Sequence, residues 1–253
     1  MAKRKRKKLK KGPKKLLILI IVVAIIFIGC EIVEYQFSYN MQRTLVEVHE
    51  KSFFTLRDFG IIVEKSPYDY NQNGIDDYRD ILNGAKEIVE INPKYISKYY
   101  AGGYPPIEEG VCTDVIWYSL KEAGYVLKDM MAKDIRNTYD KKVYKIDIID
   151  DNIDFRRVGN QQVFLERYTT SLPTDFNAID EFMPGDIITF DGWEHIAIIS
   201  DKRNERGIPY IIQNSDEEQT EKEEDVLELT DMQITGHYRF TYNEKLEKLI
   251  ESL

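Results

Sequence analysis

The chain has 253 residues, of which 43% are hydrophobic and 31% are charged, with 14 Gly, 8 Pro and 2 Cys. This composition excludes collagen-like, wholly disordered and disulfide-rich proteins. The net charge is −9, but ten of the 35 bases lie in residues 3–15, which leaves 25 bases against 44 acids in the rest of the chain. A body with a net charge of −19 repels nucleic-acid phosphate, so we expect no nucleic-acid partner.

The N-terminal residues carry the pattern of an export signal. Residues 1–15 form a basic segment, and residues 16–30 (LLILIIVVAIIFIGC) contain no charge. A helix over 16–33 is about 27 Å long, close to the ~30 Å hydrocarbon core of a bilayer. The pattern predicts a single-pass transmembrane anchor over 16–33 in the bacterial cell membrane, with an extracytoplasmic domain after it. Two alternatives stay open: a cleaved secretory peptide, and a lipoprotein attached through Cys30, because the segment Phe27-Ile-Gly-Cys30 is similar to a lipobox.

Apolar spacing predicts the elements of the remaining chain. We expect a helical stalk over 34–65, a turn-rich acidic segment over 66–80, a helix over 81–91 and a Gly/Pro-rich loop over 99–110. A helix over 111–125 carries Val115, Leu120 and Ala123 on one stripe and ends near Gly124. Residues 152–157 (NIDFRR) are expected as a strand or turn whose arginines pair with acids.

Short apolar runs predict strands in the second half of the chain. The runs lie at 186–190, 195–200, 209–213 and 236–242, and turn residues separate them. A solvated acidic loop is expected at 216–225 and a short helix at 243–253. A helix followed by a meander of strands indicates the α+β class with a mostly antiparallel sheet.

Cys112 and His195 form the candidate catalytic pair. Cys112 is the only cysteine outside the N-terminal segment, and it stands in the first turn of a predicted helix, where free backbone N–H groups and the helix dipole favour a thiolate. The alternative for this residue is a small buried hydrophobe. Of the three histidines, His195 begins a predicted strand, whereas His49 lies in the stalk and His237 has the setting of a structural residue. We therefore expect His195 to deprotonate Cys112.

These segments carry a family resemblance. Residues 99–115 resemble the Tyr-x-Tyr-Gly-Gly … Gly-x-Asp-Cys-Ser-Gly stretch of NlpC-type cell-wall peptidases, and residues 184–198 resemble their Pro-Gly-Asp-Leu-Val-x-Phe … His-Val-Gly-Ile stretch. Residues 67–240 resemble more closely the bacterial family called domain of unknown function 1287. The shared segments are Asn-Gly-Ile-Asp-Asp-Tyr, Gly-Val-Cys-Thr-Asp-Val, Asn-Ile-Asp-Phe-Arg-Arg-Val and Thr-Gly-His-Tyr-Arg-Phe.

The resemblance implies a papain-like (NlpC-type) fold over 66–242, in which the nucleophile helix packs on an antiparallel sheet. It implies Cys112 as the nucleophile and His195 as the base. A third polar residue would orient the imidazole, and this role maps to Gln213, with Asn214 as the alternative on the opposite face of the strand. Asp114 puts a negative charge near the thiol, which opposes a thiolate unless the carboxylate caps the helix or is paired.

The function that the resemblance implies is that of a thiol hydrolase, which cleaves an amide bond in bacterial cell-wall peptide and needs no cofactor for catalysis. Two other functions stay open. One is an acyltransferase or a lipid or ester hydrolase that uses the same Cys–His pair, which predicts an apolar groove beside Cys112. The other is a non-catalytic wall-binding module with a degenerate site. The sequence leaves the oligomeric state open.

A second motif has the spacing of a calcium-binding loop. The pattern Asp69-x-Asn71-x-Asn73-Gly74-x5-Asp80 places oxygen-bearing side chains at alternate positions around a glycine. The predicted ligands of a structural Ca²⁺ are the side chains of Asp69, Asn71, Asn73, Asp77 and Asp80 and the backbone carbonyl of Ile75. The alternative is an Asx-turn loop that hydrogen bonds hold in place before a helix.

Overall fold

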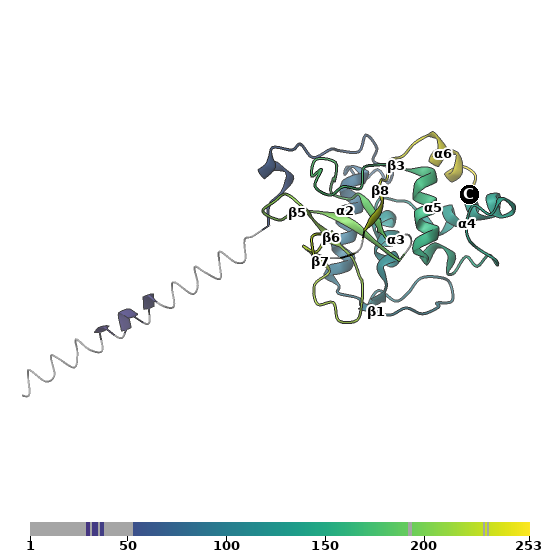
Figure 1. Cartoon of the computed structure of the whole chain (residues 1–253). Coiled ribbons are helices and arrows are strands. Elements are labelled where there is room, and N and C mark those ends of the chain that lie inside the picture. Colours follow the sequence, from purple (N-terminus) through teal and green to yellow (C-terminus); the bar gives the residue numbers. More distant parts are fainter. Residues whose placement is uncertain are drawn as a thin grey trace, which may run out of the picture. The chain divides into compact units, whose positions relative to one another are not determined.

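An antiparallel sheet of six strands organises residues 53–253 of this computed structural model (Figure 1). The sheet order is β3-β8-β4-β5-β6-β7. The strands are β3 (Thr170–Ser171), β4 (Ile187–Phe190), β5 (His195–Arg203), β6 (Pro209–Ile212), β7 (Glu223–Glu224) and β8 (Ile234–Arg239). A separate parallel pair joins β1 (Lys94–Tyr95) to β2 (Glu109–Gly110). The structure describes residues 29–30, 32–34, 36–37, 53–191, 194–229, 231 and 233–253.

Two helices form the layer that covers one face of the sheet at its centre. They are α2 (Asp77–Glu90) and α3 (Cys112–Glu122), which pack against each other and against β5. The other helical elements are η1 (Leu56–Phe59), α4 (Leu127–Thr138), η2 (Tyr139–Lys141), η3 (Asp154–Arg156), α5 (Val158–Tyr168) and α6 (Glu244–Ile250).

The sheet separates two hydrophobic cores. Successive side chains of a strand point to opposite faces. Accordingly, Ile196 and Ile198 of β5 belong to the larger core, which also contains residues of α2 and α3, whereas Ala197 and Ile199 belong to the smaller core. A shift of this strand by one residue would move each of these side chains to the other core.

The register also brings three chain segments to one end of the sheet. Ile198 of β5 pairs with Ile212 of β6, so the start of β5 lies beside the end of β6. Asn214, just after β6, donates a hydrogen bond of 3.0 Å to the carbonyl of Gly110, which precedes α3. The N-terminus of α3 is therefore at the same end as the start of β5.

The local sequence accounts for the bounds of α3. Val115, Ile116 and Leu120 are buried along the predicted stripe. The helix ends before Gly124, whose φ of +91° lies in the left-handed region that favours glycine. The backbone N–H of Tyr125 reaches back to the carbonyl of Leu120, which closes the helix end.

Several predicted elements are confirmed, whereas the part of the predicted helical stalk that the structure describes over 53–65 is helical only at η1. The helix expected over 111–125 is α3, the four expected strands are β4, β5, β6 and β8, and the short C-terminal helix is α6. The helix expected from residue 81 begins earlier, at Asp77, inside the predicted calcium loop. The sequence did not predict α4 and α5, which follow α3 in the chain, or β7, which lies inside the acidic loop.

The predicted fold class, a papain-like fold with an N-terminal transmembrane helix, is corrected. The described residues form a mixed α/β domain with a mostly antiparallel sheet. Besides α3, which was expected to pack on the sheet, this domain contains the helices α2, α4, α5 and α6. No helix among the described residues is long and apolar enough to cross a membrane. The segment predicted to do so, residues 16–33, lies outside them except for Gly29, Cys30, Ile32 and Val33.

Candidate active site

Cys112 is the first residue of α3 and is buried, with 8% of its surface exposed. The backbone N–H groups of Ile196 and Thr113 favour its thiolate form. Burial is the larger effect, and it raises the pKa of Cys112 to about 11. The N–H groups at the helix start favour the thiolate, as expected, but the desolvation of Cys112 outweighs them.

His195 begins β5 and is also buried, with 7% of its surface exposed. Its Nε2 lies 2.6 Å from Oε1 of Gln213. The amide oxygen can only accept a hydrogen bond, so Nε2 carries the proton and Nδ1 keeps its lone pair. Burial lowers the pKa of His195, which keeps the ring neutral and able to act as a base.

Gln213 owes its orientation to Glu224, a residue that the sequence analysis missed. Nε2 of Gln213 donates to the carboxylate of Glu224 at 2.8 Å, which turns Oε1 toward the imidazole. Gln219 donates to the same carboxylate oxygen at 2.6 Å. Glu224 lies in β7, which pairs with β6, so this partner becomes visible only when the short strand pairing is known.

Asn214 points away from the imidazole. Its Nδ2 donates to the carbonyl of Gly110, and its Oδ1 accepts a hydrogen bond of 2.7 Å from Nζ of the buried Lys222. The structure thus brings Gln213 to His195, whereas Asn214 connects the end of β6 to the residues before α3.

Cys112 and His195 lie at the same end of the sheet. The N–H that reaches toward the sulfur belongs to Ile196, the residue after His195. No hydrogen bond between Sγ of Cys112 and the ring of His195 is present in the described part of the chain, and Ile196 rather than His195 faces the core that contains α3. In free enzymes catalytic hydrogen bonds are often long and tighten only with substrate bound.

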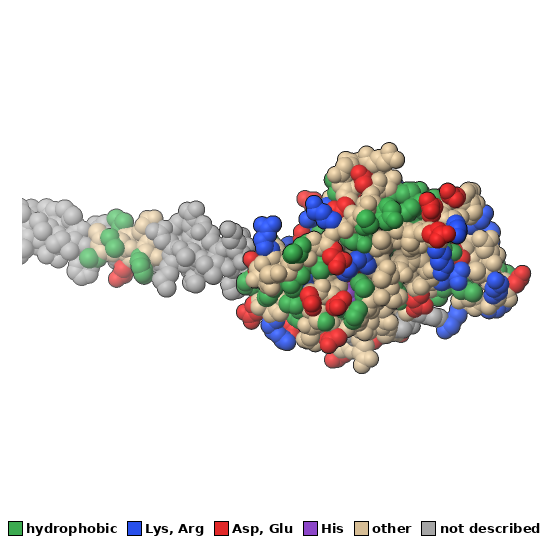
Figure 2. Space-filling view, turned by 90° about the horizontal axis from the view of Figure 1, so that it is seen from above, with side chains coloured by type: hydrophobic (Ala, Val, Ile, Leu, Met, Phe, Trp, Pro, Cys, Tyr) green, Lys and Arg blue, Asp and Glu red, His purple; other side chains and the backbone are tan. Residues whose placement is uncertain are grey.

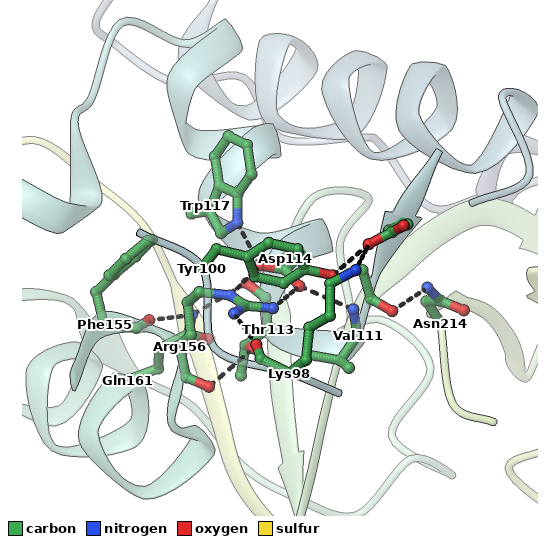
Figure 3. Close-up of polar contacts among 12 residues, drawn as sticks. Lys98, Tyr100, Val111, Thr113, Asp114, Trp117, Phe155, Arg156, Gln161 and Asn214 are labelled. Atoms are coloured by element: carbon green, nitrogen blue, oxygen red, sulfur yellow. Dashed lines mark hydrogen bonds and ion pairs between the residues drawn. The ribbon is translucent and has the colours of Figure 1, made fainter. Parts of the chain in front are cut away.

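Asp114 is both a helix cap and one half of a buried ion pair (Figure 3). Its Oδ2 accepts from the backbone N–H of Val111 at 2.8 Å and from Nη2 of Arg156 at 2.7 Å. Its Oδ1 accepts from Nε1 of Trp117 and from Nε of Arg156, both at 2.7 Å. The negative charge that the sequence puts beside Cys112 is therefore paired, and it raises the pKa of that thiol less than burial does.

The segment around Arg156 holds the start of α3 in place through hydrogen bonds to Thr113. The carbonyl of Arg156 accepts a hydrogen bond of 3.1 Å from Oγ1 of Thr113. Nε2 of Gln161 donates to the carbonyls of Thr113 and Phe155, at 3.1 and 2.8 Å. Figure 3 shows these residues gathered around the guanidinium group, which also lies over the ring of Tyr100 at 4.9 Å. Pairing of the NIDFRR arginines with acids is confirmed for Arg156.

Hydrogen bonds close the predicted calcium loop. The carboxylate of Asp69 accepts from the backbone N–H groups of Asn73 and Gly74, at 3.0 and 2.8 Å. The side-chain amides of Asn71 and Asn73 both donate to Oδ2 of Asp80 at 2.9 Å. Amide nitrogens thus lie where a calcium ion would require oxygen atoms.

The remaining predicted ligands are engaged elsewhere. The buried carboxylate of Asp77 accepts from the backbone N–H of Tyr70 at 2.8 Å and from the hydroxyl of Tyr125 at 2.7 Å. Ile75 donates its N–H to Oδ1 of Asn73. No group of three or more His, Cys, Asp or Glu side chains in the described residues is arranged to hold a metal ion. Calcium binding at this loop stays a prediction.

The other two histidines lie apart from this site. His237 accepts or donates hydrogen bonds with the carbonyl of Pro173 and the carboxylate of Asp186, and it stacks on Phe182, which fits the structural role expected for it. His49 lies outside the described residues.

Fold and site together define a mixed α/β domain with a buried cysteine at a helix start and a Gln-oriented histidine on the adjacent strand. The chain belongs to the family described as Domain of unknown function (DUF1287), whose model matches residues 82–240, a range that includes Cys112, His195 and Gln213. A curated relative, Uncharacterized protein YijF of Escherichia coli (strain K12), is 32% identical over 169 residues, which cover 63% of this chain and 80% of that protein. No solved structure matches the chain.

Proposed function

We propose that this protein is a thiol hydrolase that cleaves an amide bond in bacterial cell-wall peptide. The observation that carries the proposal is the pairing of His195 with Gln213 at the end of the sheet where the helix that bears Cys112 begins. The motifs around these residues, which resemble those of NlpC-type peptidases, support the same chemistry. The cell wall as the source of substrate rests on that resemblance alone.

The reaction begins from a neutral pair. Burial raises the pKa of Cys112 and lowers that of His195, and both shifts disfavour a resting thiolate–imidazolium ion pair. When a substrate carbonyl reaches the sulfur, Nδ1 of His195 takes the thiol proton and the sulfur forms a bond to the carbonyl carbon. The backbone N–H groups at the start of α3 donate to the oxyanion that forms.

His195 also transfers the protons in the remaining steps of the catalytic cycle, in which the thioester forms and is hydrolysed. The tetrahedral intermediate expels the amine, which takes the proton from His195 and leaves a thioester on Cys112. His195 next deprotonates a water molecule, whose oxygen attacks the thioester carbon. The acid product leaves, and the proton returns to the sulfur. Gln213, held by Glu224, keeps Nε2 protonated throughout, so that Nδ1 remains the basic nitrogen.

A groove at the start of α3, lined by Val111 and Asp114 but not by Cys112 itself, supports a second candidate, an acyltransferase or ester hydrolase that uses the same pair. The groove has a volume of about 160 Å³ and is mainly apolar. Its walls include residues on both sides of the cysteine, together with Pro105, Pro106, Ile107 and Trp117. An apolar groove at this place is what an acyl chain would require.

The two candidates are separated by their products. The full-length wild type and the Cys112→Ala variant are incubated with purified cell-wall fragments and, in parallel, with acyl esters, and the products are analysed by mass spectrometry. We expect new amine and carboxylate ends in the wall fragments with the wild type, and none with Cys112→Ala. Ester cleavage without any change in the wall fragments would favour the second candidate. Equal product patterns for the two proteins on both substrates would contradict both.

We also propose that the domain acts outside the cytoplasm. Ten bases precede the uncharged run 16–30, a pattern typical of exported proteins. Protease added to cells without their wall should degrade the domain, whereas full protection would contradict this location. Loss of membrane association in Cys30→Ser would identify a lipoprotein.

A further inference from the structure

Arg203, the last residue of β5, is completely buried, with 0% of its surface exposed. The three nitrogens of a guanidinium group all donate hydrogen bonds, and none accepts one. Nη2 of Arg203 donates to the carbonyl of Phe182, whereas Nε and Nη1 have no partner among the described residues. Buried nitrogens are normally satisfied by protein atoms, by ordered water or by an ion, so these two indicate an acceptor that the chain does not supply.

The segment that contains η1 pairs with this end of β5. The backbone N–H and C=O groups of Arg203 are bonded to those of Phe54, both at 2.7 Å. Leu56 of η1 is buried, and Phe182 belongs to the smaller core. The guanidinium group therefore lies beside the smaller core, away from bulk water.

Arg203 keeps its positive charge in this setting. Burial lowers its pKa to about 10, which still leaves the group protonated at neutral pH. No ion pair joins it to a carboxylate of the described residues. Asp186 and Asp201 lie within electrostatic range and act to raise its pKa, but neither accepts a hydrogen bond from it.

The carboxylate of Asp186 is bound by other donors. Nε and Nη2 of Arg239 donate to it, both at 2.8 Å, and so does the backbone N–H of Met183 at 2.8 Å. Nε2 of His237 lies 3.0 Å from Oδ2 of the same carboxylate. The negative charge of Asp186 is therefore balanced by Arg239.

The carboxylate of Asp201 is paired as well. It forms ion pairs with Nζ of Lys86 and, at 3.8 Å, with Nη1 of Arg79. Its side chain is 34% exposed, so solvent also screens its charge. Neither acid is thus left to neutralise Arg203.

Other arginines of the domain have direct counter-charges. The buried Arg156 makes two hydrogen bonds of 2.7 Å to Asp114. On the face shown in Figure 2, basic side chains at the surface lie next to acidic ones. Moving a charge from water into the protein interior is unfavourable unless a counter-charge and hydrogen bonds accompany it. A bound anion would supply both to Arg203.

We propose that the guanidinium group of Arg203 binds a halide ion, chloride under physiological conditions. Because the side chain has no exposed surface, an anion enclosed with it must be small, which favours a halide over phosphate or a carboxylic acid. The ion would stabilise the end of β5 to which Phe54 is paired. The site lies at the opposite end of β5 from His195 and does not depend on the proposed hydrolase activity.

The test measures stability against chloride concentration. The full-length protein is unfolded in urea while sodium chloride replaces sodium gluconate at constant ionic strength, since gluconate is too large for a closed site. An ion that binds only the folded chain stabilises it increasingly as its concentration exceeds the dissociation constant. We therefore expect the ratio of folded to unfolded protein to rise by up to about tenfold for each tenfold increase in chloride. Equal stability in the two salts would overturn the inference, because water would then satisfy the two nitrogens.

Two variants locate the effect. Arg203→Met removes the charge, keeps most of the apolar volume and should abolish the dependence on chloride. The control Arg79→Met removes an arginine whose side chain is 51% exposed and which pairs with Asp201, and it should keep the dependence. A chloride dependence that survives Arg203→Met, or that Arg79→Met also abolishes, would overturn the inference.

A second measurement needs only the wild type, in case Arg203→Met does not fold. Crystals grown in sodium bromide should show anomalous scattering from bromine next to the guanidinium group of Arg203. A water molecule at that place, without anomalous scattering, would overturn the inference. None of these measurements uses hydrolysis, so their failure would leave the proposed activity untouched, and failure of the proposed activity would leave the halide site in place.

Discussion

Replacing Arg156 with methionine should destabilise the domain strongly. Its guanidinium group makes two hydrogen bonds of 2.7 Å to Asp114, and the two side chains have exposed fractions of only 2% and 7%. Arg156→Met keeps most of the apolar volume but leaves the carboxylate buried with only Val111 and Trp117 as donors. Leaving one member of a buried ion pair uncompensated costs about 3–5 kcal/mol. We expect a loss of that size in the free energy of unfolding.

The assay is urea denaturation followed by tryptophan fluorescence, with Arg157→Met as the matched control. Arg157 is the next residue, its side chain is 55% exposed, and it lies 4.0 Å from its acidic partner Asp154. Asp154 is buried, but water screens the exposed guanidinium group of Arg157 at this distance, so we expect the pair to contribute only about 0–1 kcal/mol. Adding Asp114→Asn to Arg156→Met should restore part of the lost stability, because it removes the orphaned charge. Equal losses in Arg156→Met and Arg157→Met would refute the reasoning.

Three further predictions concern the base, the pH dependence and the loop. His195→Ala should lower kcat by about 10²–10⁴-fold, and Gln213→Ala should lower it less, because Gln213 positions the ring; a larger effect of Asn214→Ala than of Gln213→Ala on kcat would contradict this assignment. Burial lowers the pKa of His195 from 6.5, so the unfolded chain takes up the proton first as pH falls, and the free energy of unfolding should drop below about pH 6.5. Denaturation at several pH values between 7 and 5 should show a shallower drop in His195→Gln, and identical slopes would count against a buried neutral ring. Millimolar calcium should raise the Tm of the wild type and not that of Asp69→Ala; a wild-type Tm that is the same with calcium and with chelator would leave the loop an Asx-turn segment.

The sequence was sufficient to predict those helices and strands that a local pattern of apolar and turn residues specifies. The apolar stripe that ends at Gly124 predicts α3, and the short apolar runs between turn residues predict β4, β5 and β6. Cys112 and His195 could be selected because they are unusual residues at the ends of such elements.

Contacts between distant segments could not be predicted in the same way. Asp114 and Arg156 are 42 residues apart, and nothing in either local pattern specifies that they meet. The acidic run at 216–225 has the composition of a solvated loop, yet Lys222 is buried and Glu224 reaches Gln213 through β7. The desolvation of Cys112 could not be predicted for a related reason, because it depends on how α3 packs on β5.

The most direct test of the account is whether the reactivity of Cys112 depends on His195. In the Cys30→Ser background, the rate of alkylation by neutral iodoacetamide is measured from pH 6 to pH 10, with His195 intact and with His195→Ala. Because burial raises the pKa of Cys112 to about 11, we predict slow alkylation near neutral pH and faster alkylation toward alkaline pH. We also predict that His195→Ala lowers the rate near neutral pH, where the imidazole must accept the thiol proton. Equal rates in the two proteins across this range would contradict the claim that Cys112 and His195 work as a pair.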